Sequence, residues 1–165
     1  MTRHEAAEET FAILHLCNVP DAVPVLARWF LQEWAPYYGP SGPGDAESDL
    51  REAADPAHLP ICLVATEGDQ PLGTIALKEG SVDSHRHLSP WLAAFLVASE
   101  HRRRGVGTAL VSAVEQEARR LGFMRIYTAT DAAMTLLERR GWRAVDEAPT
   151  LRGTVTVYVL DLGHP

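Results

Sequence analysis

The segment that most constrains the fold is a continuous apolar run at residues 91–97, WLAAFLV, followed by an Arg-Gly turn and a helical pattern. An apolar run of this length is typical of a strand that is buried on both faces of a sheet. Residues 104–121 then repeat apolar side chains at helical spacing, and Gly122 ends the pattern. The chain therefore contains a buried strand that a short cationic turn joins to a helix.

Strand and helix patterns alternate through the rest of the chain, with no internal repeat and no linker, so residues 1–165 are predicted to form a single domain. This order predicts a three-layer α/β sandwich with a mixed sheet. Asp21 is expected to cap the first helix and Asp131 to start the last one. The remaining predicted elements are strands at 11–16, 123–130, 141–148 and 153–162, a hairpin at 61–79, and helices at 21–34 and 47–54.

Composition excludes several function classes. The net charge of −7 disfavours a nucleic-acid partner. No apolar run is long enough to span a bilayer, and the polar N-terminus lacks a signal-peptide core, so a cytoplasmic protein with no membrane partner is expected. Cys17 and Cys62 each lie among apolar residues, which predicts buried thiols, and the absence of CxxC and HExxH motifs predicts no metal.

The turn between the buried strand and its helix has the properties of a phosphate site. A helix N-terminus carries unpaired N–H groups and partial positive charge, and glycines let an anion approach the backbone. Gly105 and Gly107 stand at this helix start, after Arg102, Arg103 and Arg104. The arginines could pair with phosphate oxygens, or they could form a solvated surface patch. Neither the P-loop motif nor the GxGxxG dinucleotide motif is present.

Three motifs, in order along the chain, resemble those of the GCN5-related N-acetyltransferase (GNAT) family. The resemblance covers most of the chain and implies the acyl-CoA N-acyltransferase fold, whose mixed sheet is mostly antiparallel. It also implies transfer of the acetyl group of acetyl-CoA to an amine. The motifs are Arg102-x-x-Gly105-x-Gly107, the helix ending EARRLG at 117–122, and ERRGW at 138–142.

The resemblance implies which residues bind the cosubstrate. Backbone amides of the turn would cradle the CoA pyrophosphate. Phe95, Leu96 and Val97 would lie along the pantetheine arm, with the Val97 amide donating to the acetyl carbonyl. Thr130 or Asp131 stands where the family often has an asparagine that touches pantetheine, although we favour Asp131 as a helix cap. The residues of the turn are Arg102, Arg103, Arg104, Gly105, Val106, Gly107 and Thr108.

The chain departs from the family at the positions expected to move protons. Leu137 stands where the family often has a tyrosine that protonates the leaving thiolate, and leucine cannot donate a proton. The strand before the turn also lacks the acidic residue that many relatives carry. His87 and Glu33 are the candidate catalytic residues, with His85 and Tyr127 as further options for the base. An ordinary loop or surface role is the alternative for each of them.

By the same resemblance, the first helices and their loop line the acceptor site. Trp34, Tyr37 and Tyr38 could form an aromatic wall, and the acidic side chains around them favour a cationic amine. A core role for the aromatic residues and a solvated role for the acidic ones are the alternatives. The acidic residues are Glu33, Asp45, Glu47 and Asp49.

These observations predict an acetyl-CoA-dependent N-acetyltransferase in which a primary amine of a small molecule or peptide attacks the thioester directly. The alternative is an acyl-CoA-binding module that has lost catalysis and acts as a sensor. Relatives are often homodimers, and the final strand, with TVTVYVL at 154–160, could pair with a second chain at a sheet edge.

Overall fold

The computed structural model describes residues 11–163, in which seven strands form one sheet of order β1-β2-β3-β4-β5-β7-β6. The strands are β1 (Ala12–His15), β2 (Ile61–Glu67), β3 (Gln70–Lys78), β4 (Trp91–Val97), β5 (Arg125–Thr130), β6 (Arg143–Thr150) and β7 (Gly153–Asp161). Neighbouring strands are antiparallel except β4 and β5, which are parallel. This arrangement confirms the mixed, mostly antiparallel sheet.

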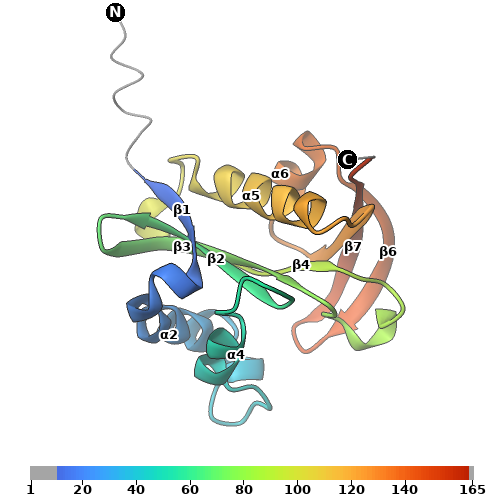
Figure 1. The fold of residues 1–165 in the computed structure, drawn as a ribbon. Helices are drawn as coiled ribbons and strands as arrows, with labels where there is room; N and C mark the ends of the chain where they lie inside the picture. The colour runs from blue at the N-terminus through green and yellow to red at the C-terminus, as the bar shows by residue number, and fades with distance from the viewer. Residues whose placement is uncertain (1–10, 164–165) are drawn as a thin grey trace, which may run out of the picture.

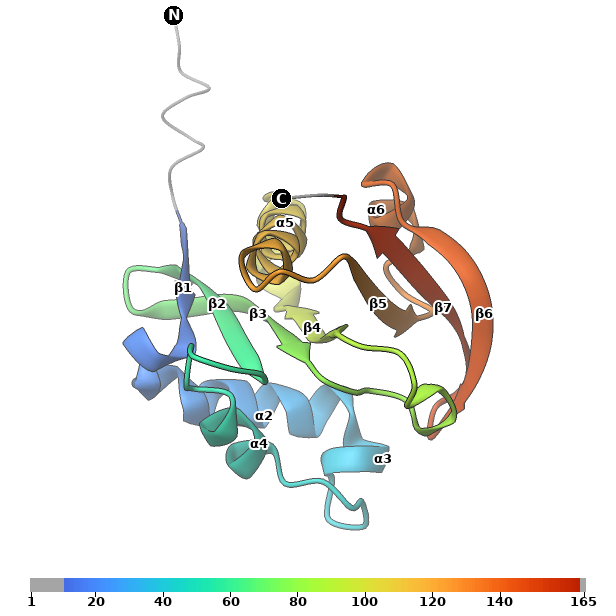
Figure 2. The same ribbon diagram turned by 45° about the vertical axis from the view of Figure 1, so that its right-hand side comes forward.

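Helices lie on both faces of the sheet, which confirms the predicted three-layer α/β/α sandwich (Figures 1 and 2). One face carries α5 (Val106–Arg120) and α6 (Met134–Arg139). The other face carries α2 (Val23–Glu33), α3 (Ala35–Tyr38) and α4 (Ala46–Glu52). The family motifs therefore lie on one side of the sheet, and the segment predicted to bind the acceptor lies on the other.

The last strand of the chain is an interior strand. β7 pairs with β5 on one side and with β6 on the other, so the prediction that this strand lies at an edge is wrong. The edge strand at this end of the sheet is β6, which contains Pro149 and a register shift between Ala144 and Asp146. Both features disfavour pairing with a further strand, because they interrupt the row of free backbone groups.

Helix α2 begins without the predicted cap. A 3₁₀ turn at Pro20–Ala22 leads into it, so Asp21 lies inside that turn and Ala22 occupies the cap position, with no side-chain hydrogen bond. Pro24 lies at the start of the helix, as expected. The helix is held by its apolar face, because Leu26 and Phe30 are buried one turn apart.

The Pro- and Gly-rich segment after α2 contains more helix than its composition predicts. Its first residues form the single turn α3, and its end leads into α4. Helix α4 has a side-chain cap, because Asp45 Oδ1 accepts a hydrogen bond from the Ser48 N–H at 3.1 Å.

Helix α6 is shorter than predicted. Its cap position is Ala133 rather than Asp131, whose side chain is exposed, so the assignment of Asp131 as a cap is wrong. A buried carboxylate instead anchors the end of α6. Glu115 is 3 % exposed and binds the Arg140 guanidinium through both oxygens, at 2.7 and 2.9 Å, and Trp142 Nε1 donates to it at 3.0 Å. The ERRGW motif thus fastens α6 to α5.

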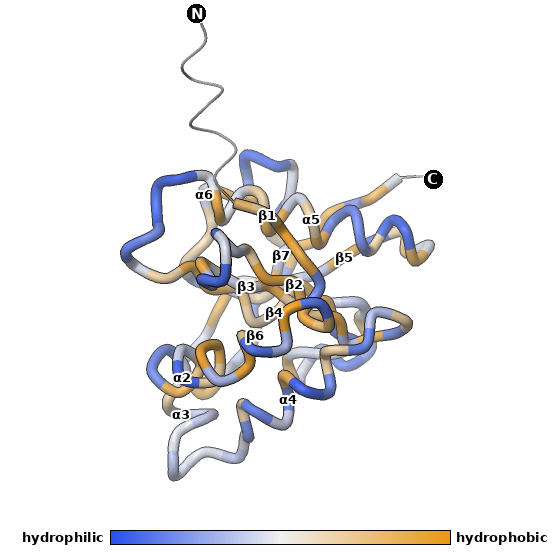
Figure 3. The backbone as a smooth tube through the Cα atoms, turned by 60° about the vertical axis from the view of Figure 1, so that its left-hand side comes forward, coloured by the Kyte–Doolittle hydropathy of each residue, from blue (hydrophilic) through white to orange (hydrophobic). Residues whose placement is uncertain are grey.

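The sheet separates two hydrophobic cores, one under α5 and one under α2 and α4. Figure 3 shows apolar residues along the central strands and hydrophilic ones in the connecting loops. Cys62 is buried, and burial raises the pKa of its thiol to about 11. Cys17 is exposed, so the prediction of buried thiols is confirmed for Cys62 and wrong for Cys17. Within residues 11–163 no helix has the length and apolarity needed to cross a bilayer.

Candidate functional site

Strands β4 and β5 part from each other shortly after they meet. Their register consists of Trp91 opposite Tyr127, where the Tyr127 N–H donates to the Pro90 carbonyl at 3.0 Å. In β4, Ala94 has a φ of 53°, and the register with β3 shifts at this point, which marks a β-bulge. A non-glycine residue in the left-handed region is uncommon and is concentrated at functional sites. Past the bulge, β4 and β5 form no further ladder pair.

The start of α5 lies beside this separation and offers free N–H groups. Gly105 is the cap residue with a φ of 82°, and no side chain caps the helix. The Ala109 N–H donates to the Gly105 carbonyl at 3.0 Å, so the preceding amides of the first turn have no partner within the helix. Arg103 also has a positive φ, 65°, which shapes the turn into a concave row of amides. Such a row binds anions.

The space around Gly105 and Gly107 indicates whether this turn can accept a phosphate-linked arm. A Cβ at Gly107 would lie 3.3 Å from Phe95 Cζ and 3.8 Å from both Val97 Cγ2 and Leu136 Cδ2. A Cβ at Gly105 would meet no atom within 4 Å. The helix start is therefore packed closely on β4 on one side and open on the other. The residues fit an anion held at the open turn.

The three arginines differ in what they contact. Arg102 Nε donates to the Val97 carbonyl at 3.1 Å, and Arg104 forms an ion pair with Glu67 at 3.2 Å. Arg103 is exposed. Two of the three side chains therefore brace the turn against β4 and the β2–β3 hairpin. Their charge still contributes to the positive potential of the turn.

The remaining residues predicted to bind pantetheine lie near the same opening. Phe95 and Val97 pack on the core under α5, and Leu96 is half-buried. Thr130 Oγ1 accepts from the Ala132 N–H at 3.0 Å and so shapes the turn after β5. Asp131 is exposed.

Helix α6 offers no proton donor at the position where the family often has one. Leu137 is 1 % exposed and belongs to the core. Leu136 is the α6 side chain that lies near Gly107. The buried phenol on this face belongs to Tyr158 on β7, which the sequence analysis did not consider. Burial, and to a lesser extent Glu138, raise the pKa of Tyr158, which therefore stays protonated at neutral pH.

The two candidate catalytic residues come from different segments. Glu33 ends α2, and His87 lies in the loop before β4; both are exposed, and neither side chain makes a hydrogen bond or ion pair within residues 11–163. His85 is buried, with Nε2 2.9 Å from Asp146 Oδ2 and Nδ1 2.7 Å from Ser84 Oγ. This contact fastens the loop to β6 and lowers the pKa of Asp146.

Trp34, Tyr37 and Tyr38, the predicted aromatic wall, lie in one cluster of rings with Phe30, and much of this cluster is core. The Phe30 ring lies 5.1 Å from Trp34 and 5.5 Å from Tyr38, and Ala94 at the bulge packs against the same cluster. Tyr38 is buried and donates to Asp49 Oδ2 at 2.7 Å. Tyr37 is 43 % exposed. It lines a hollow of about 270 Å³ with Asp49, Glu52, Pro60, Lys78, Glu79 and Gly80.

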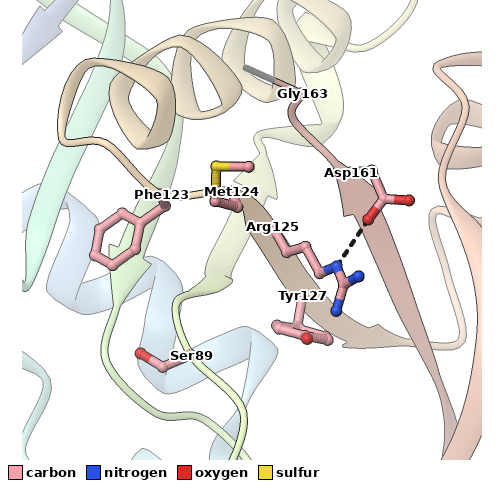
Figure 4. A pocket seen from close by; sticks show the side chains of 7 residues that line it. All are labelled: Ser89, Phe123, Met124, Arg125, Tyr127, Asp161 and Gly163. Atoms are coloured by element: carbon pink, nitrogen blue, oxygen red, sulfur yellow. Dashed lines mark hydrogen bonds and ion pairs between the residues drawn. The ribbon is translucent and has the colours of Figure 1, made fainter. Parts of the chain in front are cut away.

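A larger hollow, of about 420 Å³, lies at the N-terminal end of β5 (Figure 4). Arg125 points across it and pairs with Asp161 at 2.9 Å. Because β5 runs from this hollow toward the opening beside α5, the two are at opposite ends of the strand. Within residues 11–163 no group of three or more His, Cys, Asp or Glu side chains could hold a metal ion. The lining residues are Ser89, Phe123, Met124, Arg125, Tyr127, Asp161 and Gly163.

Similar solved structures include acetyltransferases. An aminoglycoside 6'-N-acetyltransferase in complex with coenzyme A is 17% identical, covers 93% of this chain and 98% of its own, and has a TM-score of 0.73. The aminoglycoside 6'-N-acetyltransferase from Enterococcus faecium is 19% identical, with 93% and 98% covered and a TM-score of 0.72. A GCN5-related N-acetyltransferase from Kribbella flavida is 21% identical, with 93% and 98% covered and a TM-score of 0.71. These likenesses confirm the fold.

The sequence itself matches the family described as Acetyltransferase (GNAT) over residues 25–142. No curated protein sequence matches the chain significantly. The family match runs from α2 through α6 to Trp142, and so includes the bulged strand, the Arg-Gly turn and the segment bound to Glu115. The protein belongs to the GNAT acetyltransferase family.

Proposed function

We propose that this protein transfers the acetyl group of acetyl-CoA to a primary amine by direct attack. The amine nitrogen forms a bond to the thioester carbonyl carbon, and the bond between that carbon and sulfur breaks. The amine loses one proton and the departing thiolate gains one. The separation of β4 from β5 beside the uncapped start of α5 carries this proposal, because it places a gap in the sheet next to an anion-binding turn.

Backbone groups of the chain would hold the cosubstrate. The amides of residues 102–108 would bind the pyrophosphate, and the β4 backbone at Phe95, Leu96 and Val97 would direct the pantetheine arm. The Val97 N–H would stabilise the negative charge that develops on the carbonyl oxygen. CoA supplies an activated acyl group when it is bound.

Positioning is expected to contribute more than proton transfer. Holding two reactants in line can lower a barrier by about 7–11 kcal/mol in favourable cases, whereas a general acid contributes about 10²–10⁴-fold. Leu136 and Leu137 supply no acid from α6. Glu33 and His87 remain the proposed acceptors of the amine proton. Glu33→Gln and His87→Asn test this, since loss of the base should lower kcat most where the base is deprotonated and the amine is not, and least at high pH, where the amine has already lost its proton.

We propose a cationic acceptor. The exposed ring of Tyr37 and the carboxylates of Asp49, Glu52 and Glu79 share one hollow on the α2 side of the sheet. Carboxylates and aromatic faces both attract ammonium groups, although Lys78 in the same hollow opposes them. Aminoglycosides belong in the first panel, because two structures of the same fold carry that substrate in their descriptions. Polyamines and basic peptides complete it.

The first experiment is calorimetric titration with acetyl-CoA, followed by thiol release against the amine panel. Gly105→Asp and Gly105→Asn form a matched pair, because both side chains tolerate a positive φ and they differ in charge. We expect the aspartate variant to lose CoA affinity at least about tenfold relative to the asparagine variant, since repulsion of the pyrophosphate costs more than about 1.4 kcal/mol. Equal affinities would refute this placement of the cosubstrate.

The same experiment tests a second function. A sensor module that binds acyl-CoA without turnover is favoured by one observation, the buried Leu137 at the position of the family's tyrosine. Binding without thiol release across the whole panel would support it. Amine-dependent release would exclude it.

A further inference from the structure

We propose that Thr128 is a positioning residue that fixes how far β4 and β5 separate, and thereby limits the length of the acyl group that fits between them. The inference rests on the proposed function. Thr128 is 3 % exposed, and its Oγ1 donates to the Leu92 carbonyl at 2.9 Å. This hydrogen bond joins the two strands one residue past their register pair, where the separation begins.

The geometry of a parallel ladder shows what the hydroxyl replaces. Hydrogen bonds between parallel strands are evenly spaced, two residues apart on each strand. The Tyr127 N–H donates to the Pro90 carbonyl, so the next bond in a regular ladder would join the Ala129 N–H to the Leu92 carbonyl. That carbonyl accepts the Thr128 hydroxyl instead. The hydroxyl thus stands at the carbonyl where the ladder would otherwise continue, and no further ladder pair joins the two strands.

The surroundings hold Thr128 in this position. Its register partner on β7 is Tyr158, whose buried ring belongs to the same core as Leu92. On β4, the bulge at Ala94 follows two residues after Leu92 and turns the strand away. The hydroxyl and the bulge act together, because one ends the ladder and the other bends the strand. The methyl group and hydroxyl of Thr128 then form the narrow end of the gap.

The hydroxyl and the methyl group of Thr128 each have a predicted effect on which acyl groups fit the gap. A valine at this position has the same shape but cannot donate, so the Leu92 carbonyl becomes free to accept from the Ala129 N–H and the gap narrows. A serine keeps the hydrogen bond but lacks the methyl group, which leaves room for a longer chain. Thr128→Val should therefore disfavour longer acyl groups, and Thr128→Ser should favour them.

The test is calorimetric affinity of the whole chain for CoA, acetyl-CoA, propionyl-CoA and butyryl-CoA. Relative to wild type, we expect the ratio of propionyl-CoA to acetyl-CoA affinity to fall at least about threefold in Thr128→Val and to rise by a similar factor in Thr128→Ser. Affinity for CoA itself, which has no acyl group, should change less than about twofold in both. A threefold change corresponds to about 0.65 kcal/mol of binding free energy, and a twofold change to about 0.4 kcal/mol.

Thr74→Val is the matched control. Thr74 on β3 is also buried, and its hydroxyl also donates to a strand carbonyl, that of Leu63 at 3.0 Å. This hydrogen bond joins β3 to β2 rather than β4 to β5, although the Thr74 backbone pairs with Leu96 on β4. This variant should lose stability as Thr128→Val does, but its ratio of propionyl-CoA to acetyl-CoA affinity should stay that of the wild type.

Different results would overturn different statements. If both Thr128 variants bind CoA and keep the wild-type acyl ratio, the inference is wrong and the proposed function stands. If Thr74→Val shifts the ratio as much as Thr128→Val, the effect is one of general stability and the inference is wrong. If Thr128→Val does not fold, the predicted rise in Thr128→Ser still decides the question. If the wild-type chain does not bind CoA, the proposed function fails and the inference fails with it.

Discussion

The two sides of β4 are built in different ways. On the α5 side, the turn after β4 presents backbone N–H groups, and Gly105 and Gly107 keep side chains out of the way. On the α2 side, the surface consists of side chains, with Trp34 and Tyr38 packed on Phe30 and Tyr37 left exposed. The first side suits a ligand part that is always the same, a pyrophosphate. The side chains on the α2 side can change from one protein to another without disturbing the turn on the α5 side.

The two sides also differ in what holds them in place. On the α5 side, the buried carboxylate of Glu115 binds Arg140 and Trp142 and so fastens α6 beside the turn. The α2 side depends mainly on apolar packing, with side-chain hydrogen bonds at its rim such as that between Tyr38 and Asp49. The stability of the α5 side should therefore be more sensitive to single polar substitutions than that of the α2 side.

The largest expected effect is that of Glu115→Ala. The substitution leaves the Arg140 guanidinium and the Trp142 N–H without their acceptor, and losing one partner of a buried pair costs about 3–5 kcal/mol. Because Arg140 keeps some contact with solvent, we expect the lower part of this range. Urea unfolding measures it. Arg125→Ala, which removes an exposed pair with Asp161, is the control and should change stability far less.

Gly107→Val should damage the α5 side alone. The new side chain would press on Phe95 and Leu136, and overpacking of this kind costs about 1–3 kcal/mol. If that cost appears in binding, CoA affinity falls by about ten- to hundredfold. Calorimetry measures the loss. Gln116→Val, an exposed β-branched substitution in the same helix, controls for helix propensity, and equal losses in both variants would contradict the close-packing argument.

The contrast between the two sides explains which parts of the site could be predicted from the sequence. Glycines at the start of a helix, next to a buried strand, indicate free amides wherever they occur, so the anion-binding turn was predictable. The roles of side chains were not, because they depend on distant partners. Thr128 acts on a carbonyl 36 residues away, and His85 contacts an aspartate 61 residues away. A threonine within a strand pattern indicates only a residue suited to strands.

The same distinction between local patterns and distant partners applies to the fold. Periodicity predicted the strands and the longer helices, since it depends on local burial. The caps at Asp21 and Asp131 were predicted wrongly, because the chain enters α2 through a 3₁₀ turn and α6 starts at a later residue. The place of β7 inside the sheet was also missed, because strand order is set by pairings between distant segments.

Tyr38→Phe should affect only the α2 side. The variant removes the phenol that donates to Asp49, and an intramolecular hydrogen bond contributes about 0.5–1.5 kcal/mol. We expect a small loss of stability and a higher KM for the acceptor, with an unchanged Kd for CoA. The opposite pattern, weaker CoA binding with an unchanged acceptor KM, would show that the two sides of β4 are not independent. Tyr37→Phe, which removes an exposed hydroxyl from the same aromatic group, should leave stability as it is.

The smallest expected effect concerns the loop before β4, which joins neither helix layer and is fastened by His85 to Asp146 on β6. The hydrogen bond from His85 lowers the pKa of Asp146 in the folded protein, so the unfolded chain binds that proton more tightly. The stability from this contact is therefore complete above the ordinary aspartate pKa of about 3.9 and is lost as the pH falls below it.

Urea unfolding of the wild type and of Asp146→Asn across this acidic range tests the argument. The difference in unfolding free energy between the two should be constant at higher pH and should shrink as Asp146 of the wild type is protonated. Asp83→Asn is the control in the same loop, since Asp83 is almost fully exposed and pairs with Arg86, a neighbour along the chain. A difference that stays constant through the acidic range would mean that the loop is held by the packing of Leu88 and Trp91 rather than by this contact.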